Sequence, residues 1–179
     1  MRKSRRNLSV KKLTLAAAAV ALSTVLLMIG TLLDVMDLCM LALSSLFVLF
    51  GMMELEQGYP FLIYAGTSVL SFLFLPSKFV PCLYVGFAGI YPYLKFRMEK
   101  LPRAAARALK TLYFNAVLVG AYFLYCYVFM LDTGSTPLYL KIILFFVANI
   151  TFVFYDLVLT RFVRFYFIKL RPRFERLLK

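Results

Sequence analysis

Residues 13–33 read LTLAAAAVALSTVLLMIGTLL, and this stretch decides the fold class because its 21 positions contain no charged side chain. An α-helix rises about 1.5 Å per residue, so a stretch of this length crosses a hydrocarbon core of about 30 Å. Residues 57–77 and 111–131 are uncharged over the same length. The chain is therefore predicted to be an all-α integral membrane protein.

Three further apolar stretches are shorter or carry a charge. Residues 38–53 and 79–94 are uncharged over 16 positions, which is near the lower limit for a spanning helix. Residues 138–160 are apolar apart from Lys141 and Asp156. Because the loops are short, we predict a single polytopic domain over the whole chain, 1–179. Its six membrane helices are predicted at about 13–33, 36–53, 59–76, 79–96, 111–131 and 138–160, with a basic tail at 161–179.

The basic residues predict the orientation of these helices. Cytoplasmic loops of membrane proteins accumulate Lys and Arg, and three clusters contain every base except Lys78 and Lys141. Both termini are then cytoplasmic. The inside turn with Glu54 and Glu56 has no base, which is tolerated because acidic residues count little in this rule. Short outside turns are predicted to hold Asp34, Asp37, Lys78 and Asp132. The clusters are Arg2, Lys3, Arg5, Arg6, Lys11 and Lys12; Lys95, Arg97, Lys100, Arg103, Arg107 and Lys110; and Arg161, Arg164, Lys169, Arg171, Arg173, Arg176 and Lys179.

Composition agrees with a membrane protein. Hydrophobic residues make up 63% of the chain, well above the roughly 45–50% of a soluble domain. The net charge of +13 lies beside membrane segments, so anionic lipid headgroups are expected partners and nucleic acid is not. The N-terminal apolar run is too long for a signal peptide and is expected to remain as the first helix. We expect a multi-pass protein of a plasma membrane, with bacterial origin favoured.

Several kinds of chemistry are excluded. The chain has no His, and its three Cys residues, one each in predicted helices 2, 4 and 5, are not paired by spacing. Histidine-dependent nucleophilic catalysis and histidine-ligated metals are therefore ruled out, and no phosphate-binding P-loop is present. We expect no catalytic residue, no metal and no cofactor.

Two basic segments are predicted to form short amphipathic helices in the headgroup region. After the fourth span, Arg103, Arg107 and Lys110 follow at helical spacing on one face, behind Pro102. After the sixth span, the tail at 161–179 alternates bases with aromatic residues. A cytoplasmic partner subunit is the alternative occupant of these surfaces.

Polar groups inside a membrane are costly and mark candidate functional sites. Asn149 lies near mid-depth of the last span, with no charge nearby to explain it. Asp156 is as readily explained by an ion pair with Arg161 or Arg164. Interhelical hydrogen bonding is the simpler role for the hydroxyls Ser44, Ser45, Thr67, Ser68 and Ser71.

Pro92 interrupts the fourth span. Proline lacks a backbone N–H and clashes with the preceding turn, so it is predicted to kink or end the helix there. Gly86 and Gly89 nearby permit close packing. A broken helix can line a binding cavity.

The stretch KKLTLAAAAVAL at 11–22 resembles the start of helix 1 in the substrate-binding S components of energy-coupling factor (ECF) vitamin transporters. The resemblance implies six helices with both termini inside. It also implies that an A-x-x-x-A face, here Ala17 and Ala21, docks on a coupling transmembrane subunit that joins two cytoplasmic ATPases. Alanines spaced by four allow another helix to approach closely.

Three functions remain open from the sequence. The first is a substrate-capturing subunit of an ECF-type importer for a small micronutrient. A lipid-modifying membrane enzyme is the second, and Asp156 alone is poor support for it. A non-catalytic assembly or scaffold protein is the third. For the importer, the predicted ligand enters from outside and is bound by Asn149, Tyr122, Tyr125, Ser44 and Ser45.

Overall fold

In the part that the structure describes, the chain is helical apart from short turns and contains no strand. This computed structural model describes residues 2–33, 36–55, 58–128 and 137–170, and the side chains of 2–9, 103, 127–128, 138 and 170 are outside the description. Asp34, Glu56, Asp132 and the tail from 171 onward, all named above, lie outside the described residues. The helices are α1 (Arg2–Leu33), α2 (Asp37–Glu54), α3 (Gly58–Phe74), α4 (Phe79–Leu83), the π-helical turn η1 (Tyr84–Ala88), α5 (Tyr91–Met98), α6 (Arg103–Phe123), η2 (Leu124–Val128), α7 (Leu138–Phe165) and η3 (Tyr166–Leu170).

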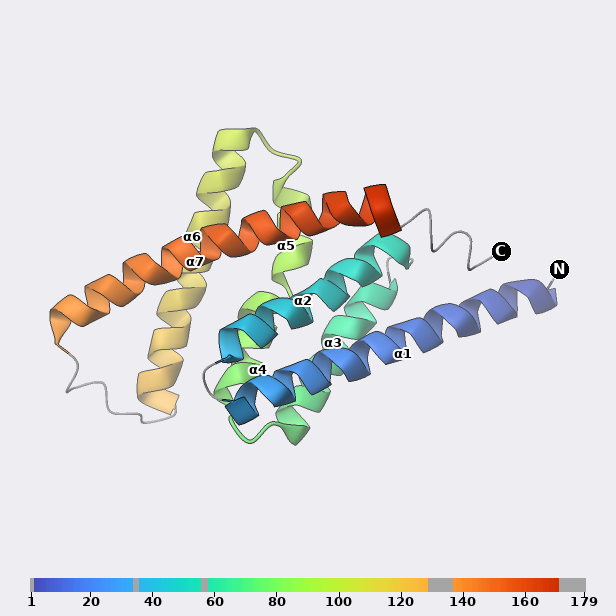
Figure 1. Ribbon diagram of the computed structural model, residues 1–179, viewed down its shortest axis with the longest axis horizontal. Helices are drawn as coiled ribbons and strands as arrows, with labels where there is room; N and C mark the ends of the chain where they lie inside the picture. The colour runs from blue at the N-terminus through green and yellow to red at the C-terminus, as the bar shows by residue number, and fades with distance from the viewer. Residues whose placement is uncertain (1, 34–35, 56–57, 129–136, 171–179) are drawn as a thin grey trace. The chain divides into compact units, whose positions relative to one another are not determined.

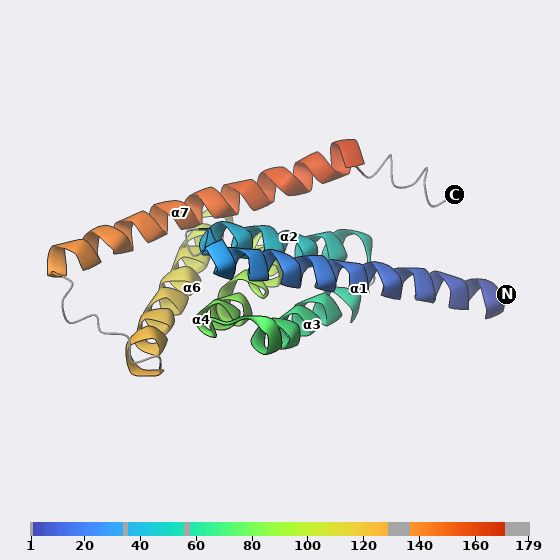
Figure 2. The same ribbon diagram turned by 60° about the horizontal axis from the view of Figure 1, so that its bottom comes forward.

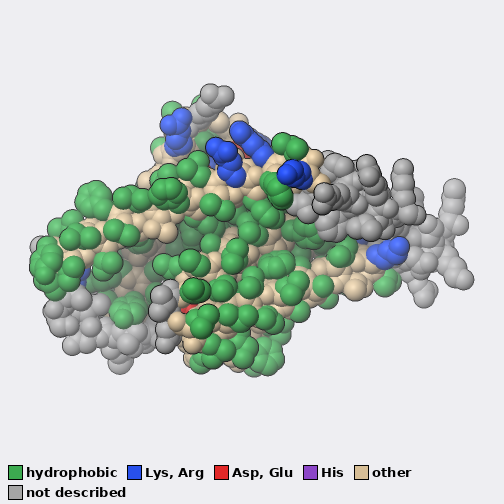
Figure 3. Space-filling view, in the orientation of Figure 1, with side chains coloured by type: hydrophobic (Ala, Val, Ile, Leu, Met, Phe, Trp, Pro, Cys, Tyr) green, Lys and Arg blue, Asp and Glu red, His purple; other side chains and the backbone are tan. Residues whose placement is uncertain are grey.

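Four helical stretches are long and apolar enough to cross a membrane: Val10–Leu33, Asp37–Glu54, Ala104–Cys126 and Tyr139–Lys169. The helix Gly58–Phe74 is apolar but shorter. Hydrophobic side chains cover most of the face in Figure 3, as expected for contact with lipid. The prediction of an all-helical chain with long apolar helices is confirmed for the described residues.

The chain divides into two compact units, Met1–Leu131 and Asp132–Lys179. In the first unit, α1 packs along α2 and α3, and α2 packs along α3 (Figures 1 and 2). The segment formed by α4, η1 and α5 contacts α2 and α3, and α6 contacts η1 and α5. The second unit consists of α7 and η3 and is described by itself.

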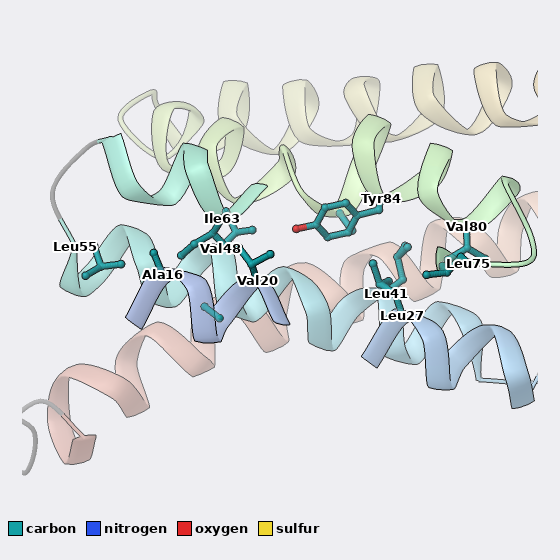
Figure 4. Close-up of a cluster of buried hydrophobic side chains, with 12 residues drawn as sticks. Ala16, Val20, Leu27, Leu41, Val48, Leu55, Ile63, Leu75, Val80 and Tyr84 are labelled. Atoms are coloured by element: carbon teal, nitrogen blue, oxygen red, sulfur yellow. The ribbon is translucent and has the colours of Figure 1, made fainter. Parts of the chain in front are cut away.

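The core of the first unit forms where α1 presents small side chains to its neighbours. Ala16, Ala19, Val20 and Leu27 recur at helical spacing and are buried. They meet residues of α2 and α3 such as Val48 and Ile63 (Figure 4). Burying one such aliphatic side chain contributes about 1.5–3 kcal/mol. The apolar stretch 13–33 thus contains side chains that pack in the bundle interior and exposed side chains that are suited to contact with lipid.

The prediction of two separate short amphipathic helices is wrong for the described residues, because the basic segments there belong to longer helices. Arg103 to Lys110 form the first turns of α6, which continues without a break to Phe123. Pro102 precedes the helix with extended backbone, and no residue between 103 and 123 interrupts the helical ladder. In the same way, Arg161 and Arg164 belong to α7 itself.

The predicted single helix at 79–96 is interrupted. The chain runs through α4 and η1, turns at Gly89 and Ile90, and starts α5 with Pro92 in its first turn. The break predicted near Pro92 is confirmed. It falls just before the proline, since this ring fits the first turn of a helix.

Candidate functional site: a buried hydroxyl cluster

Tyr84 belongs to the interrupted segment 79–98, and its side chain lies in the core of the first unit. Tyr84 opens the π-helical turn η1, in which the N–H of Gly89 donates to the carbonyl of Tyr84 at 2.8 Å. Such turns are rare and are frequent at functional sites. The Tyr84 side chain is fully buried, and its hydroxyl points toward the side of the core where Val20, Val48 and Ile63 lie (Figure 4).

Two tyrosines from neighbouring helices hold this turn. The hydroxyl of Tyr64 on α3 donates to the carbonyl of Val85 at 3.1 Å. The hydroxyl of Tyr113 on α6 donates to the carbonyl of Gly86 at 2.5 Å. A break in a helix leaves backbone groups without their regular partners, and these two side chains supply hydrogen bonds to such groups.

A close approach at Gly89 fixes the rings around Tyr84. A Cβ at Gly89 would lie 2.5 Å from Cδ2 of Tyr64 and 3.0 Å from Cε1 of Tyr84. The rings of Tyr64 and Tyr84 stack with centroids 6.2 Å apart. Only glycine therefore lets the chain pass this close to both rings.

Four hydroxyl side chains from four elements meet in the core. Ser23 of α1, Ser44 of α2, Thr67 of α3 and Tyr84 of η1 are each 0% exposed. The hydroxyls of Ser23 and Ser44 share a hydrogen bond of 2.5 Å. We call these residues the hydroxyl cluster. It carries no formal charge.

Two members of the hydroxyl cluster lack a hydrogen-bond partner among the described residues: Thr67, through Oγ1, and Tyr84, through its hydroxyl. The hydroxyls of Thr67, Ser23 and Ser44 lie near the Tyr84 hydroxyl and interact with it, although none of them forms a hydrogen bond of regular geometry with it. A buried hydroxyl without a partner costs about 1–3 kcal/mol. The hydroxyl cluster would therefore gain stability from a polar group that forms a hydrogen bond with Thr67 or Tyr84.

No family model, curated protein or solved structure matches the chain.

The predicted site residues are divided between the two units. Ser44 belongs to the hydroxyl cluster. Ser45 is also buried, and its hydroxyl donates to the carbonyl of Ala42 at 2.6 Å in its own helix. Asn149 lies in α7 and donates to the carbonyl of Phe145 at 3.0 Å. Because α7 belongs to the other unit, a shared site of Asn149 and Ser44 stays a prediction.

The two predicted tyrosines lie at the end of α6 and in η2. Tyr122 is 47% exposed, and its ring meets that of Phe123. The ring of Tyr125 meets the edge of Phe79 with centroids 5.6 Å apart. Within the described ranges neither tyrosine forms a hydrogen bond or ring contact with the hydroxyl cluster, so their role in binding stays a prediction.

The predicted docking residues lie on the outer face of α1. Ala17 and Ala21 are exposed, whereas Ala16, Ala19 and Val20 face the core. This face of α1 presents small side chains to its surroundings, as close approach by another helix requires.

Sequence reasoning missed two members of the hydroxyl cluster. Ser23 and Tyr84 were not singled out, and Thr67 was expected to serve interhelical hydrogen bonding. The signal for Ser23 was its register, because it follows Ala16 and Ala19 at helical spacing on the buried side of α1. Tyr84 had no comparable signal, since aromatic residues are frequent throughout this chain.

Proposed function

We propose that the chain is the membrane-embedded, substrate-capturing subunit of an ECF-type importer for a small micronutrient. It is not an enzyme, and separate coupling and ATPase subunits supply the energy. The observation that carries the proposal is a pair of fully buried hydroxyls, of Thr67 on α3 and Tyr84 in η1, that have no hydrogen-bond partner in the described part of the chain. Intramembrane polar groups are functional candidates, and these two are available for a ligand.

The proposed topology has six crossings with both termini in the cytoplasm. The four long apolar stretches supply four of them. The shorter α3 and the interrupted α4–η1–α5 segment supply the other two. Interrupted helices commonly form the binding sites of membrane transporters, because unwound backbone offers groups that a regular helix consumes.

The chemistry of the hydroxyl cluster favours a neutral ligand. Hydroxyl groups both donate and accept hydrogen bonds, and none of the four carries a formal charge. The stacked rings of Tyr64 and Tyr84 provide an aromatic wall beside them. A small, uncharged molecule with hydroxyl, carbonyl or amide groups fits these features. An ionised ligand would lack a counter-charge in the hydroxyl cluster and would bind at a high desolvation cost.

Thr67→Val tests the ligand site with almost no change of shape. We expect the purified protein to retain a small molecule that mass spectrometry identifies. Thr67→Val should lower its retention about fivefold or more, because one lost hydrogen bond in a dry site costs about 1–3 kcal/mol. Ser71→Ala is the matched control. Ser71 is also buried on α3, but its hydroxyl already donates to the carbonyl of Ser68 at 2.9 Å.

Equal retention in Thr67→Val and Ser71→Ala would contradict the ligand site. If no small molecule is retained by the wild-type protein, and none stabilises it in a screen of neutral micronutrients, the assembly or scaffold function is favoured instead.

The second test concerns the outer face of α1. Replacing both Ala17 and Ala21 with leucine should abolish co-purification with a co-expressed coupling subunit, because two large side chains prevent close helix approach. The matched control replaces Ala104 and Ala108, which are exposed alanines with the same spacing on α6. Affinity purification from membranes measures both variants.

The control should co-purify like the wild type, and circular dichroism should show both variants folded. Normal complex formation by the α1 variant would overturn docking through Ala17 and Ala21, and would leave the ligand site as a separate question.

A further inference from the structure

The turn between α5 and α6 is fixed by an ion pair that involves two lysines. The Nζ of Lys110 lies 3.1 Å from Oε1 of Glu99, and the Nζ of Lys95 lies 3.6 Å from the same oxygen. Both lysines are buried, with relative exposures of 8% and 3%. These contacts join the end of α5 to the second turn of α6, so the turn presents its remaining bases in a defined arrangement.

Three bases project from this turn into the surroundings. Arg97, Lys100 and Arg107 are exposed, and within the described part of the chain none of them forms a salt bridge. The Nζ of Lys100 lies 5.2 Å from the centroid of the Phe96 ring. We call Arg97, Lys100 and Arg107 the exposed triad. It is a positive surface, because Glu99, the acid in this turn, is already paired with Lys95 and Lys110.

The surrounding sequence adds to this excess of positive charge. Glu99 is the sole acidic residue in the sequence between positions 57 and 131. The first turn of α6 has no acidic residue, although acids are favoured at that end of a helix. The positive end of the helix dipole therefore adds to the exposed triad and attracts an anion.

Large exposed apolar side chains occur in the same segment of the chain as the exposed triad. Phe96 is 60% exposed, Leu101 46% and Leu112 67%. The turn directly precedes Ala104–Cys126, one of the stretches suited to crossing a membrane. Bases interleaved with exposed apolar groups at the end of such a helix match the boundary between headgroups and acyl chains.

We propose that the α5–α6 turn binds the phosphate-bearing headgroup of an anionic membrane lipid through Arg97, Lys100 and Arg107. The guanidinium groups suit the phosphate oxygens, since arginine presents several N–H donors in a fixed plane. Phe96, Leu101 and Leu112 contact the upper acyl chains of the same lipid. This proposal does not depend on the proposed import function.

Native mass spectrometry of the full-length protein in detergent tests the proposal. The protein is mixed with phosphatidylglycerol or with phosphatidylcholine, and the bound lipid is counted for each. We expect the wild type to prefer phosphatidylglycerol. The variant Arg97→Gln, Lys100→Gln, Arg107→Gln should retain it at least about tenfold less, since each base near a membrane surface contributes appreciably to anionic lipid binding.

The control removes positive charge elsewhere, by Lys78→Gln and Lys141→Gln, the two bases that lie outside the three basic clusters. It should keep the preference for phosphatidylglycerol within about twofold of the wild type. Equal losses in the two variants would overturn the proposal, because total charge would then explain binding. Equal retention of both lipids by the wild type would overturn it as well.

Two further results distinguish the headgroup from other anions. Excess glycerol phosphate should not displace the bound lipid, because it lacks the acyl chains that Phe96 and the leucines contact. Displacement by glycerol phosphate would overturn the lipid as the ligand and assign a free phosphate site. Loss of an acidic protein partner in the triad variant, with lipid retention unchanged, would also overturn the proposal.

Discussion

Tyr84→Phe is expected to stabilise the ligand-free protein and to abolish ligand retention. The substitution removes a fully buried hydroxyl that lacks a hydrogen-bond partner among the described residues, and it keeps the ring in the core. Removing such a group should return about 1–3 kcal/mol to the free energy of unfolding. The same change deletes a hydrogen bond to the ligand, so the two effects have opposite signs.

Tyr64→Phe is the matched control for Tyr84→Phe, because the same atom is removed from a stacked neighbour. The Tyr64 hydroxyl donates to the carbonyl of Val85, so its loss leaves that carbonyl unsatisfied and should lower stability by about 1 kcal/mol or more. The chain contains no Trp, so thermal unfolding is followed by circular dichroism. Equal destabilisation by both substitutions would contradict an unpartnered Tyr84 hydroxyl.

Gly89→Ala is expected to destabilise the first unit by about 1–2 kcal/mol. The new Cβ would lie 2.5 Å from Cδ2 and 2.7 Å from Cε2 of Tyr64, and overpacking of this kind costs about 1–3 kcal/mol. The ring cannot withdraw easily, because its hydroxyl is bonded to Val85. The smaller backbone freedom of Ala in the unfolded chain favours the variant by about 0.4–1 kcal/mol, which only partly offsets this cost.

Gly86→Ala, three residues earlier, is expected to have the opposite effect on stability. A Cβ at Gly86 meets no atom within 4 Å, so this substitution should stabilise the protein by about 0.5–1 kcal/mol. In a Tyr64→Leu background, Gly89→Ala should cost less stability than it does in the wild type, since the smaller side chain gives room. Thermal unfolding measures the single and double variants. A neutral Gly89→Ala would show that the rings are free to move.

The fold class follows from the sequence because charge-free stretches in a membrane protein have few alternatives. Residues 13–33 had to form a helix that satisfies its own backbone, and α1 does. Pro92 likewise predicted a break that the structure contains. The start of α6 was missed because the bases at 103–110 have amphipathic spacing. That spacing does not reveal whether the helix stops or continues into the apolar stretch.

The hydroxyl cluster was only partly predictable for a different reason. On a membrane helix, a Ser or Thr can donate to a carbonyl of its own preceding turn or to a neighbouring helix. Thr24 donates to the carbonyl of Val20 in its own helix at 2.9 Å. Its neighbour Ser23 instead shares a hydrogen bond with Ser44 on another helix. The packing of the helices decides which of these two hydrogen bonds forms, and sequence spacing does not specify that packing.

The tyrosine contacts at η1 have a consequence for how the bundle can move. Two adjacent carbonyls, of Val85 and Gly86, depend on side chains from α3 and α6. If either helix moved away, one of these carbonyls would lose its hydrogen bond, at a cost of about 1 kcal/mol or more. The two hydrogen bonds therefore tie the break to both helices. A movement of the bundle that keeps both bonds has to carry Tyr64, Tyr113 and η1 together.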